Sequence, residues 1–371
     1  MSSSGEISLQ CIITSLIHDK TPNGYIRILR YLIGRVYPIM RRLPNVCMIK
    51  LNNTQLIQFG DLHGTKHTID LLSTLNLSDG QTHLLVNGDM CDRGHESTET
   101  VMVLFAYFIH GNVTLLRGNH ELSKVWNVYG FHKEIKKKFD IFAIEAIVIF
   151  KMLFEVLPLA AIIEGEMNER YLSVHGGPPF VVGMHRQYTI DEINSWNRFQ
   201  DDFDPTTEEG FAILQMLWND PRPITGLAPS NRGVGLYYGE DALRQFLIVN
   251  NLKFIIRSHE LVESGYNELW KDASGVAICS TLFSSPNYGG PKYTNVGGIL
   301  QVNSNLHINY YQFGNNTVFG DLSQSLSLVS DNCDDDDITI YCNSPRNEEF
   351  TPPLLFTDDL LREFYFNFEF L

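Results

Sequence analysis

Three short loops of this chain carry side chains that could bind metal ions. They are residues 60–64 (Gly-Asp-Leu-His-Gly), 88–94 (Gly-Asp-Met-Cys-Asp-Arg-Gly) and 118–121 (Gly-Asn-His-Glu). Their carboxylate, amide and imidazole groups are ligands for zinc, iron or manganese rather than for an iron–sulfur cluster or a cysteine-rich structural zinc. The glycines among them allow the backbone and a metal ion to approach each other closely.

Each loop follows a short apolar run that is typical of a buried strand. The runs are Leu56 to Phe59, Leu84 to Val86 and Val113 to Leu116, and helical patterns separate them, from about Thr65 to Leu75 and from about Ser97 to His110. Strands that alternate with helices form parallel βαβ units. Because ligands bind at the carboxyl edge of such sheets, we expect the three loops to lie along one edge.

Two further histidines extend the candidate site. His175 follows a predicted strand at 170–174, and His259 follows another at 253–256. Taken alone, each would more often be a hydrogen-bonded core residue. Together with the loops they complete a set of two aspartates, one asparagine and three histidines. Such a set suits a paired-metal centre, in which one carboxylate bridges ions about 3.5–4 Å apart and the pKa of bound water falls to about 7.

Three arginines flank these loops: Arg93, Arg117 and Arg232. The planar guanidinium group binds phosphoryl oxygens well. Arg93 adjoins the loop that carries Asp89 and is predicted to clamp a phosphate. Arg117 is expected to be structural and to pair with a nearby carboxylate, and spacing alone does not place Arg232.

The rest of the chain is expected to be helical at first and β-rich later. Helical spacing covers residues 9–45 and 134–154, and residues 185–235 are polar and are expected to be loop-rich. The second half should hold strands at 156–163, 276–283, 298–302 and 307–312, and a short helix at 241–251.

The composition indicates an acidic globular protein. Its 371 residues can bury a large core, and a net charge of −15 leaves no basic footprint for nucleic acid. The most apolar segment, Ile141 to Ile163, is interrupted by charged residues and a proline, which predicts a buried helix followed by a strand rather than a membrane span. No Cys-x-x-Cys pair and no signal peptide are evident, so a cytoplasmic or nuclear location is expected.

These loops and several longer motifs resemble the catalytic core of the PPP family of serine/threonine protein phosphatases, within the metallophosphoesterase superfamily. The resemblance covers roughly residues 30 to 315. Its most specific segments are 115–121 (LLRGNHE), 128–131 (VYGF), 217–221 (LWNDP), 232–235 (RGVG) and 285–288 (SPNY). The stretch around 257–260 (RSHE) is most similar to the branch of phosphatase 5 and the EF-hand phosphatases.

The resemblance implies a calcineurin-like α/β fold, in which two mixed β-sheets pack as a sandwich flanked by helices. We divide the chain into an N-terminal segment that packs on the core (1–29), a catalytic domain (30–318) and an acidic, aromatic C-terminal tail (319–371). Two interpretations of the tail stay open: it folds back into the cleft as an inhibitory mimic of phosphosubstrate, or it packs on the body as a final helix or strand.

The family pattern also implies a role for each site residue. The implied cofactors are two metal ions, manganese or iron and zinc, held by Asp61, His63 and Asp89 on one side and by Asp89, Asn119, His175 and His259 on the other, with Asp89 as the bridge. His120, oriented by Asp92, would protonate the departing serine or threonine oxygen. Arg93 and Arg232 would clamp the phosphate, and Tyr288 would line the cleft.

The implied activity is hydrolysis of phosphoserine and phosphothreonine in proteins, by direct attack of a water that the two metal ions activate. The implied partners are phosphoprotein substrates and regulatory or targeting subunits. One alternative is a small-molecule or dinucleoside polyphosphate phosphoesterase, and segments 232–235 and 285–288 favour the protein phosphatases over it. A second alternative is a non-catalytic interaction module on this fold, against which the intact ligand set argues.

Two positions depart from the family pattern. Gly289 stands where many members have a cysteine, so reagents that alkylate that cysteine are expected to fail here. Cys91 replaces an aliphatic residue between Asp89 and Asp92, and is either a small core residue or a redox-sensitive thiol near the metals.

Overall fold

The computed structural model describes residues 7–65, 71–72, 77, 80–183, 186–290 and 292–314. The predicted tail at 319–371 and most of the helix predicted from Thr65 to Leu75 lie outside these residues. Within the described ranges, no helix combines the length and the apolar character that a membrane crossing requires.

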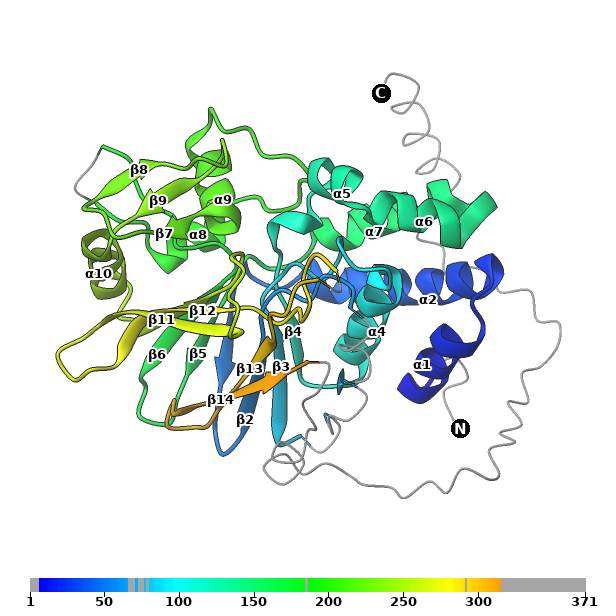
Figure 1. Cartoon of the computed structure of the whole chain (residues 1–371), viewed down its shortest axis with the longest axis horizontal. Coiled ribbons are helices and arrows are strands. Elements are labelled where there is room, and N and C mark those ends of the chain that lie inside the picture. Colours follow the sequence, from blue (N-terminus) through cyan, green and yellow to red (C-terminus); the bar gives the residue numbers. More distant parts are fainter. Residues whose placement is uncertain are drawn as a thin grey trace. The chain divides into compact units, whose positions relative to one another are not determined.

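Two mixed β-sheets lie at the centre of the described chain (Figure 1). The six-stranded sheet has the order β1 (Val46–Lys50), β5 (Ala160–Glu164), β6 (Arg170–Val174), β10 (Phe254–Arg257), β12 (Ala277–Leu282) and β11 (Tyr266–Lys271). The five-stranded sheet has the order β14 (Ile308–Phe313), β13 (Gly297–Val302), β2 (Gln55–Phe59), β3 (Thr82–Val86) and β4 (Val113–Leu115). The predicted α/β fold with two mixed sheets is confirmed.

The strand directions gather the candidate loops at one edge. Strands β2, β3 and β4 are parallel neighbours. Their last residues are paired, Phe59 with Val86 and Val86 with Leu115. The three metal-competent loops therefore leave the same carboxyl edge, as the sequence predicted. In the other sheet β6, β10 and β12 are also parallel neighbours, so the loops that carry His175 and His259 leave a shared edge.

A buried apolar core joins the two sheets. Its members from the six-stranded sheet include Ile49, Ile163 and Ile256, and those from the five-stranded sheet include Leu85 and Leu300. Burial of such side chains is the main favourable contribution to folding, at about 25 cal/mol per Å² of apolar surface.

Near the carboxyl edges, polar side chains connect the sheets directly. Asn87 Nδ2 donates to the Val174 carbonyl over 3.0 Å and to Ser258 Oγ over 2.9 Å. Gln58 Nε2 donates to Ser173 Oγ over 2.9 Å. These buried bonds fix one sheet against the other next to the loops.

Helices and a small third sheet complete the fold (Figure 1). One group of helices packs together and consists of α1 (Leu9–His18), α2 (Pro22–Met40), α4 (Ser97–His110), α6 (Phe131–Phe139) and α7 (Ala143–Glu155). The remaining α-helices of the described chain are α5 (Ser123–Tyr129), α8 (Ile190–Ser195), α9 (Glu208–Trp218) and α10 (Glu240–Val249). The third sheet, which the sequence did not predict, has the order β7 (Asp220–Pro221), β9 (Leu236–Tyr238) and β8 (Leu227–Pro229).

Two predicted helical stretches are divided in the structure. The stretch 9–45 breaks between α1 and α2, where Thr21 Oγ1 accepts from the Gly24 amide over 3.1 Å and Pro22 begins the second helix. The stretch 134–154 breaks at Asp140, whose φ of 48° is not helical. Helix α2 runs without interruption through the predicted boundary between residues 29 and 30.

The prediction that residues 185–235 are loop-rich is wrong for α9. This helix begins after Thr207, whose Oγ1 accepts from the Gly210 amide over 3.1 Å. Its first turn begins with Glu208, Glu209 and Gly210, so the apolar residues appear only from Phe211 onward. Local composition therefore obscured a helix that its cap and its packing against the core stabilise.

The strand predicted at 156–163 begins only at Ala160. Pro158 precedes it, and the amides of Leu159 and Ala160 both donate to the Asn45 carbonyl, where the pairing with β1 begins. Strands β1 and β11 were not predicted. β11 is mostly exposed or half-buried, so it has no apolar run to reveal it.

Candidate active site

The structure brings all six predicted metal ligands to the neighbouring carboxyl edges of the two sheets. Asp61 and His63 follow β2, Asp89 follows β3, and Asn119 begins the single-turn 3-10 helix η1 (Asn119–Glu121) after β4. From the other sheet, His175 follows β6 and His259 follows β10. The side chains of all six are buried.

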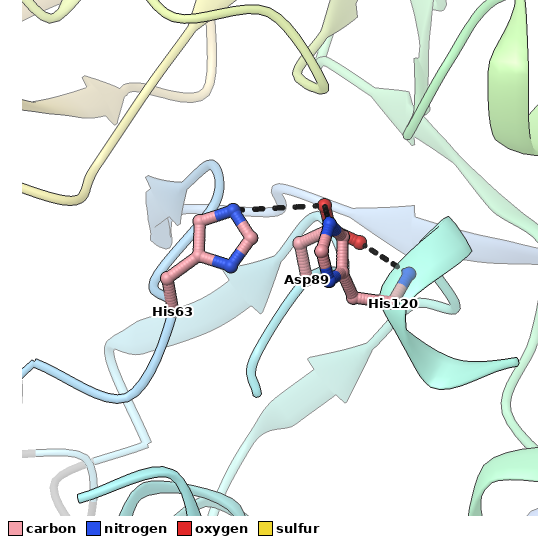
Figure 2. Close-up of side chains that lie close together, drawn as sticks. All are labelled: His63, Asp89 and His120. Atoms are coloured by element: carbon pink, nitrogen blue, oxygen red, sulfur yellow. Dashed lines mark hydrogen bonds and ion pairs between the residues drawn. The ribbon is translucent and has the colours of Figure 1, made fainter. Parts of the chain in front are cut away.

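Asp89 lies between the two halves of this cluster. Figure 2 shows its carboxylate between the imidazole of His63 and the backbone amide of His120. His63 Nε2 is 3.8 Å from Asp89 Oδ2 and 3.7 Å from an oxygen of Asp61. On the other side, His175 Nε2 is 3.3 Å from Asp89 Oδ1. Two groups of possible ligand atoms thus share Asp89, one with His63 and His120 and one with His175 and His259.

The hydrogen bonds of the histidines show that the cluster suits cations. Each of His63 and His175 has its Nδ1 within 2.9 Å of a backbone carbonyl, of Cys91 and Asn87 respectively, so Nδ1 carries the proton. When the His175 ring is neutral, the lone pair on its Nε2 faces Asn119 Oδ1 at 2.9 Å and Asp89 Oδ1 at 3.3 Å. Acceptors that converge without a donor need a positive charge among them, which a metal ion supplies.

A further observation supports this fit. His259 Nε2 is buried and has no hydrogen-bond partner in the described structure, although its backbone amide donates to Asp61 Oδ1 over 3.0 Å. A buried polar nitrogen without a partner is costly unless it binds something. The residues present therefore fit a pair of metal ions.

Glycine allows the loops to approach each other. A Cβ atom on Gly118 would lie 2.2 Å from Asp89 Oδ1, and one on Gly88 would lie 2.9 Å from His175 Nδ1. Neither position has room for a side chain. The glycines of the two motifs are thus needed for the close packing of the ligand loops as well as for their turns.

The charges of the cluster depend on one another. Burial alone would raise the pKa of the Asp89 carboxyl, but the positive charges of His175 and His120 outweigh it and hold that pKa well below its usual range. For His175, burial favours the neutral ring, yet the Asp89 carboxylate prevails and raises the pKa to about 9. A metal ion at His175 competes with this proton, so its affinity falls in acid.

Glu121 organises the loops, a role that the sequence did not reveal. Its carboxylate accepts hydrogen bonds from the amides of Asp89, Met90 and Gly118 at 2.8–2.9 Å. Burial and the Asp89 charge raise the pKa of Glu121 to about 7, partly offset by these amides. The residue belongs to the motif at 118–121, but only the fold shows that three amides from two loops converge on it.

His120 is held by Asp92 in the arrangement of an acid–base pair. His120 Nδ1 lies 2.6 Å from Asp92 Oδ2, while Asp92 Oδ1 accepts from the Phe131 amide over 2.8 Å. The other ring nitrogen, Nε2, lies on the side of Asp89 at 3.9 Å. A carboxylate on Nδ1 fixes the tautomer and leaves Nε2 to exchange a proton.

A cleft of about 280 Å³ lies over the cluster and is lined by Arg93, Arg232, Tyr129 and Tyr288 as well as by His120. The Arg93 guanidinium lies 4.0 Å from the ring centre of Tyr129 and 5.8 Å from that of Tyr288. It is exposed and forms no ion pair with any described carboxylate. Arg93 is therefore available to an anion in the cleft.

Arg232 enters the cleft from the loop between β8 and β9, where sequence spacing could not place it. Its Nε donates to Asp220 Oδ2 over 2.7 Å, and Asp220 Oδ1 accepts from Arg257 over 2.9 Å. The carboxylate thus fixes Arg232, and with Arg222 Nη2 at 3.6 Å three arginines surround this one negative charge. Asp220 lies in the segment 217–221, but sequence reasoning did not give it this role.

Arg117 is buried and structural, as expected, but its partners differ from the prediction. Its Nη1 donates to the carbonyl oxygens of Arg198 and Gln200 at 3.1 and 2.8 Å, and no carboxylate pairs with it among the described residues. Burial lowers the pKa of Arg117 to about 10. The guanidinium holds a backbone turn in place of an ion pair.

The two departures from the family pattern have structural explanations. Cys91 is fully buried and its Sγ donates to the His120 carbonyl over 3.2 Å, while burial raises the pKa of its thiol well above the usual range. These features favour a small core residue over a reactive thiol. Gly289 has a φ of 94°, and a Cβ there would lie 2.8 Å from the Tyr293 ring, so this loop favours glycine over cysteine.

Comparison with known proteins gives the same picture. The model of the calcineurin-like phosphoesterases matches residues 54–263. Serine/threonine-protein phosphatase T of Schizosaccharomyces pombe is 34% identical over 281 residues, which cover 74% of this chain and 55% of that protein. Serine/threonine-protein phosphatase 5 of Solanum lycopersicum is 35% identical over 254 residues, which cover 67% of this chain and 42% of that protein. The chain spans about half the length of the curated relatives it matches.

A solved structure is also similar. It is a protein serine/threonine phosphatase from Saccharomyces cerevisiae, described as similar to human phosphatase PP5. The TM-score is 0.65 at 28% sequence identity, and the match covers 78% of this chain and 91% of that one.

Proposed function

The chain belongs to the calcineurin-like phosphoesterase family, in its PPP branch, and from this we propose that it hydrolyses phosphoserine and phosphothreonine esters in proteins. One observation carries the proposal: two groups of ligand atoms share Asp89 beneath a cleft lined by two arginines. Members of this family work with a dinuclear metal centre. Together with a cleft whose arginines would bind phosphate, such a centre provides what a phosphoesterase needs.

The ligand roles are part of the proposal. Asp61 and His63 would hold one ion, Asn119, His175 and His259 would hold the other, and Asp89 would bridge them, with manganese or iron and zinc as the proposed metals. When bound, such a pair polarises the phosphoryl group and supplies a nucleophile at neutral pH.

The chain's own residues would bind the ester and move one proton. Arg93 and Arg232 line the cleft from different loops and would hold the phosphoryl oxygens by charge-assisted hydrogen bonds. His120 Nε2 would give its proton to the leaving serine or threonine oxygen, while Asp92 stabilises the ring in the required tautomer. The Tyr288 ring, 4.9 Å from that of His63, would close one wall of the cleft.

The organisation of the whole chain remains part of the proposal. We keep the segment 1–29, the catalytic domain 30–318 and the tail 319–371 as working divisions. We also keep phosphoproteins as substrates, regulatory or targeting subunits as partners, and a cytoplasmic or nuclear location. Truncation after Ser330 distinguishes the two interpretations of the tail. If the tail is inhibitory, we expect truncation to increase activity; if it packs on the body, we expect truncation to lower thermal stability.

The test is metal analysis of the purified chain together with hydrolysis assays, with and without added manganese. The proposal predicts about two metal ions per chain, turnover of p-nitrophenyl phosphate, and preference for phosphoserine and phosphothreonine peptides over diadenosine tetraphosphate. Preference for the dinucleotide would overturn the assignment in favour of a small-molecule phosphoesterase. Metal binding without any turnover would indicate a non-catalytic module.

A further inference from the structure

The loop after Asp89 has an unfavourable backbone conformation. Asp92 and Arg93 are consecutive residues with φ of 70° each, in the left-handed region that residues other than glycine rarely adopt. Such conformations persist only where neighbouring groups hold them. Since these two residues orient the proposed acid and bind the proposed phosphate, whatever holds this loop bears on the reaction.

Helix α6 is bonded to this loop at both of its ends. At its first residue, the Phe131 amide donates to Asp92 Oδ1 over 2.8 Å. At its last turn, Lys138 Nζ donates to the carbonyl oxygen of His95 over 3.0 Å. The helix therefore spans the loop as a brace, with Arg93 between its two attachment points.

Helix α6 also caps the N-terminus of helix α4, which follows the loop. The N-cap residue of α4, Glu96, makes no side-chain capping bond. Glu134 of α6 takes this role, because its carboxylate accepts from the amides of Ser97 and Thr98 at 3.3 and 2.7 Å. Lys138 Nζ binds this carboxylate at 2.8 Å, so the cap and the loop share one ammonium group.

Lys138 also connects the loop to the N-terminal helix α2. Its Nζ lies 2.5 Å from Glu99 Oε2, and the hydroxyl of Tyr25 in α2 donates to the other oxygen of the same carboxylate. Tyr25 and Glu99 are buried. A continuous chain of polar contacts thus leads from α2 to the loop that carries Asp92 and Arg93.

We propose that Lys138 is a positioning residue for Arg93 and Asp92, and that Tyr25 supports it from helix α2. The proposal rests on the proposed phosphatase function. Lys138 donates its three protons to the His95 carbonyl, Glu134 and Glu99, and so completes a partly buried arrangement that fixes the strained loop. It does not line the cleft.

The structure separates this role from metal binding. Asp89 is held by Glu121 and by the His120 amide, none of which contacts Lys138. If Lys138 is replaced, the loop from Asp92 to His95 relaxes while the ligand groups keep their supports. Phosphate binding and turnover should fall, and metal content should not. A merely structural lysine would lower stability and leave phosphate affinity unchanged.

The experiment compares Lys138→Met with Lys136→Met, an exposed lysine of the same helix without an ion pair among the described residues. The full chain loaded with manganese is used, with p-nitrophenyl phosphate as substrate and inorganic phosphate as a competitive ligand. For Lys138→Met we expect kcat/KM to fall about 10- to 100-fold and the phosphate dissociation constant to rise about 5- to 10-fold, because small displacements of binding groups have effects of this size. Lys136→Met should match the wild type, and Lys138→Arg should restore most of the loss.

A second pair of variants, with smaller changes, keeps the test decisive if Lys138→Met does not fold. Tyr25→Phe removes only the hydroxyl that binds Glu99, and we expect a loss of phosphate affinity of about 2- to 5-fold. Its control is Tyr31→Phe on the same helix, whose hydroxyl accepts from the Ile7 amide instead. Wild-type phosphate affinity and kcat/KM in folded Lys138→Met, or in Tyr25→Phe if Lys138→Met does not fold, overturn the inference. Lack of turnover in the wild type would refute the proposed function, whereas phosphate affinity, measured calorimetrically, tests the inference separately.

Discussion

His120, which lines the cleft, is bonded from behind by Asp92, with Nδ1 of the imidazole 2.6 Å from Oδ2 of the carboxylate. Asp92 has no exposed surface. Because its other oxygen is bonded to the Phe131 amide, the carboxylate cannot rotate away from the ring. The pair is thus preorganised, which is the arrangement expected of a proton donor with a fixed tautomer.

The first prediction concerns His120→Asn. We expect turnover to fall about 100- to 10,000-fold, as is usual for loss of a general acid, while metal content stays unchanged because His120 is proposed as an acid and not as a ligand. Since His120 also lies close enough to Asp89 and His63 to join a metal group, metal analysis by mass spectrometry is the deciding measurement. Loss of one metal ion would show that His120 is a ligand.

The second prediction concerns Arg93→Ala and Arg93→Lys. The alanine variant should lose about 10- to 1,000-fold in kcat/KM, with weaker inhibition by inorganic phosphate and normal metal content. Lysine should restore only part of this, because an ammonium group lacks the planar fork of the guanidinium. Arg42→Ala, an exposed arginine on the first turn after α2, serves as the control. Equal kinetics for the alanine variants at positions 93 and 42 would contradict the clamp.

The third prediction concerns Gly118→Ala. The added methyl group would overlap Asp89 Oδ1 at 2.2 Å, so the carboxylate must move away from the position between the two ligand groups. We expect loss of metal and activity, although the backbone at Gly118, with φ of −100°, suits alanine. Gly111→Ala is the matched control, because its nearest neighbour would be 3.3 Å away. Full metal content in Gly118→Ala would show that the loops are less tightly packed.

The fourth prediction concerns stability in acid. Burial lowers the pKa of His83 in β3 to about 4, against about 6.5 in an unfolded chain. The unfolded state therefore binds more protons between these values, and the stability contributed by the neutral ring is lost as pH falls from about 6.5 to about 4. At about 1.36 kcal/mol per pKa unit, this amounts to about 3 kcal/mol.

His83→Gln should remove this dependence, since glutamine does not titrate and can still reach Thr114 Oγ1, which lies 2.9 Å from the His83 ring. Denaturant unfolding at pH 7, 5.5 and 4 measures it. The difference in unfolding free energy between variant and wild type should shift in favour of the variant toward pH 4. A difference that stays constant with pH would rule out His83 as the titrating group.

The sequence predicted where the candidate site lies better than it predicted which residues hold the site in place. The loops with Asp61, Asp89 and Asn119 could be placed because each follows an apolar run at a strand end, and the helix at 97–110 was predicted with the observed bounds. The metal-ligand and acid–base roles of these residues stay predictions. Spacing could not show that amides from two loops converge on Glu121, or that Tyr25 reaches Glu99 across 74 positions.

The misplaced elements share a physical cause. Helix α9 begins with a polar turn that hides its start within a polar stretch, and strand β11 is largely exposed and lacks the apolar period on which sequence reasoning depends. Arg117 was expected to pair with a carboxylate, but its Nη1 donates to two backbone carbonyl oxygens instead, and such acceptors leave no trace in residue types.

The chain crosses between the two sheets repeatedly, and β2, from which Asp61 follows, obtains its second neighbour only when β13 pairs with it. During synthesis on the ribosome, the early loops are therefore made long before His259 and β13 emerge. A nascent chain that ends before β13 has an open strand edge at the centre of its future site. The complete set of candidate ligands and the paired edge of β2 therefore exist only once nearly the whole described region has been translated.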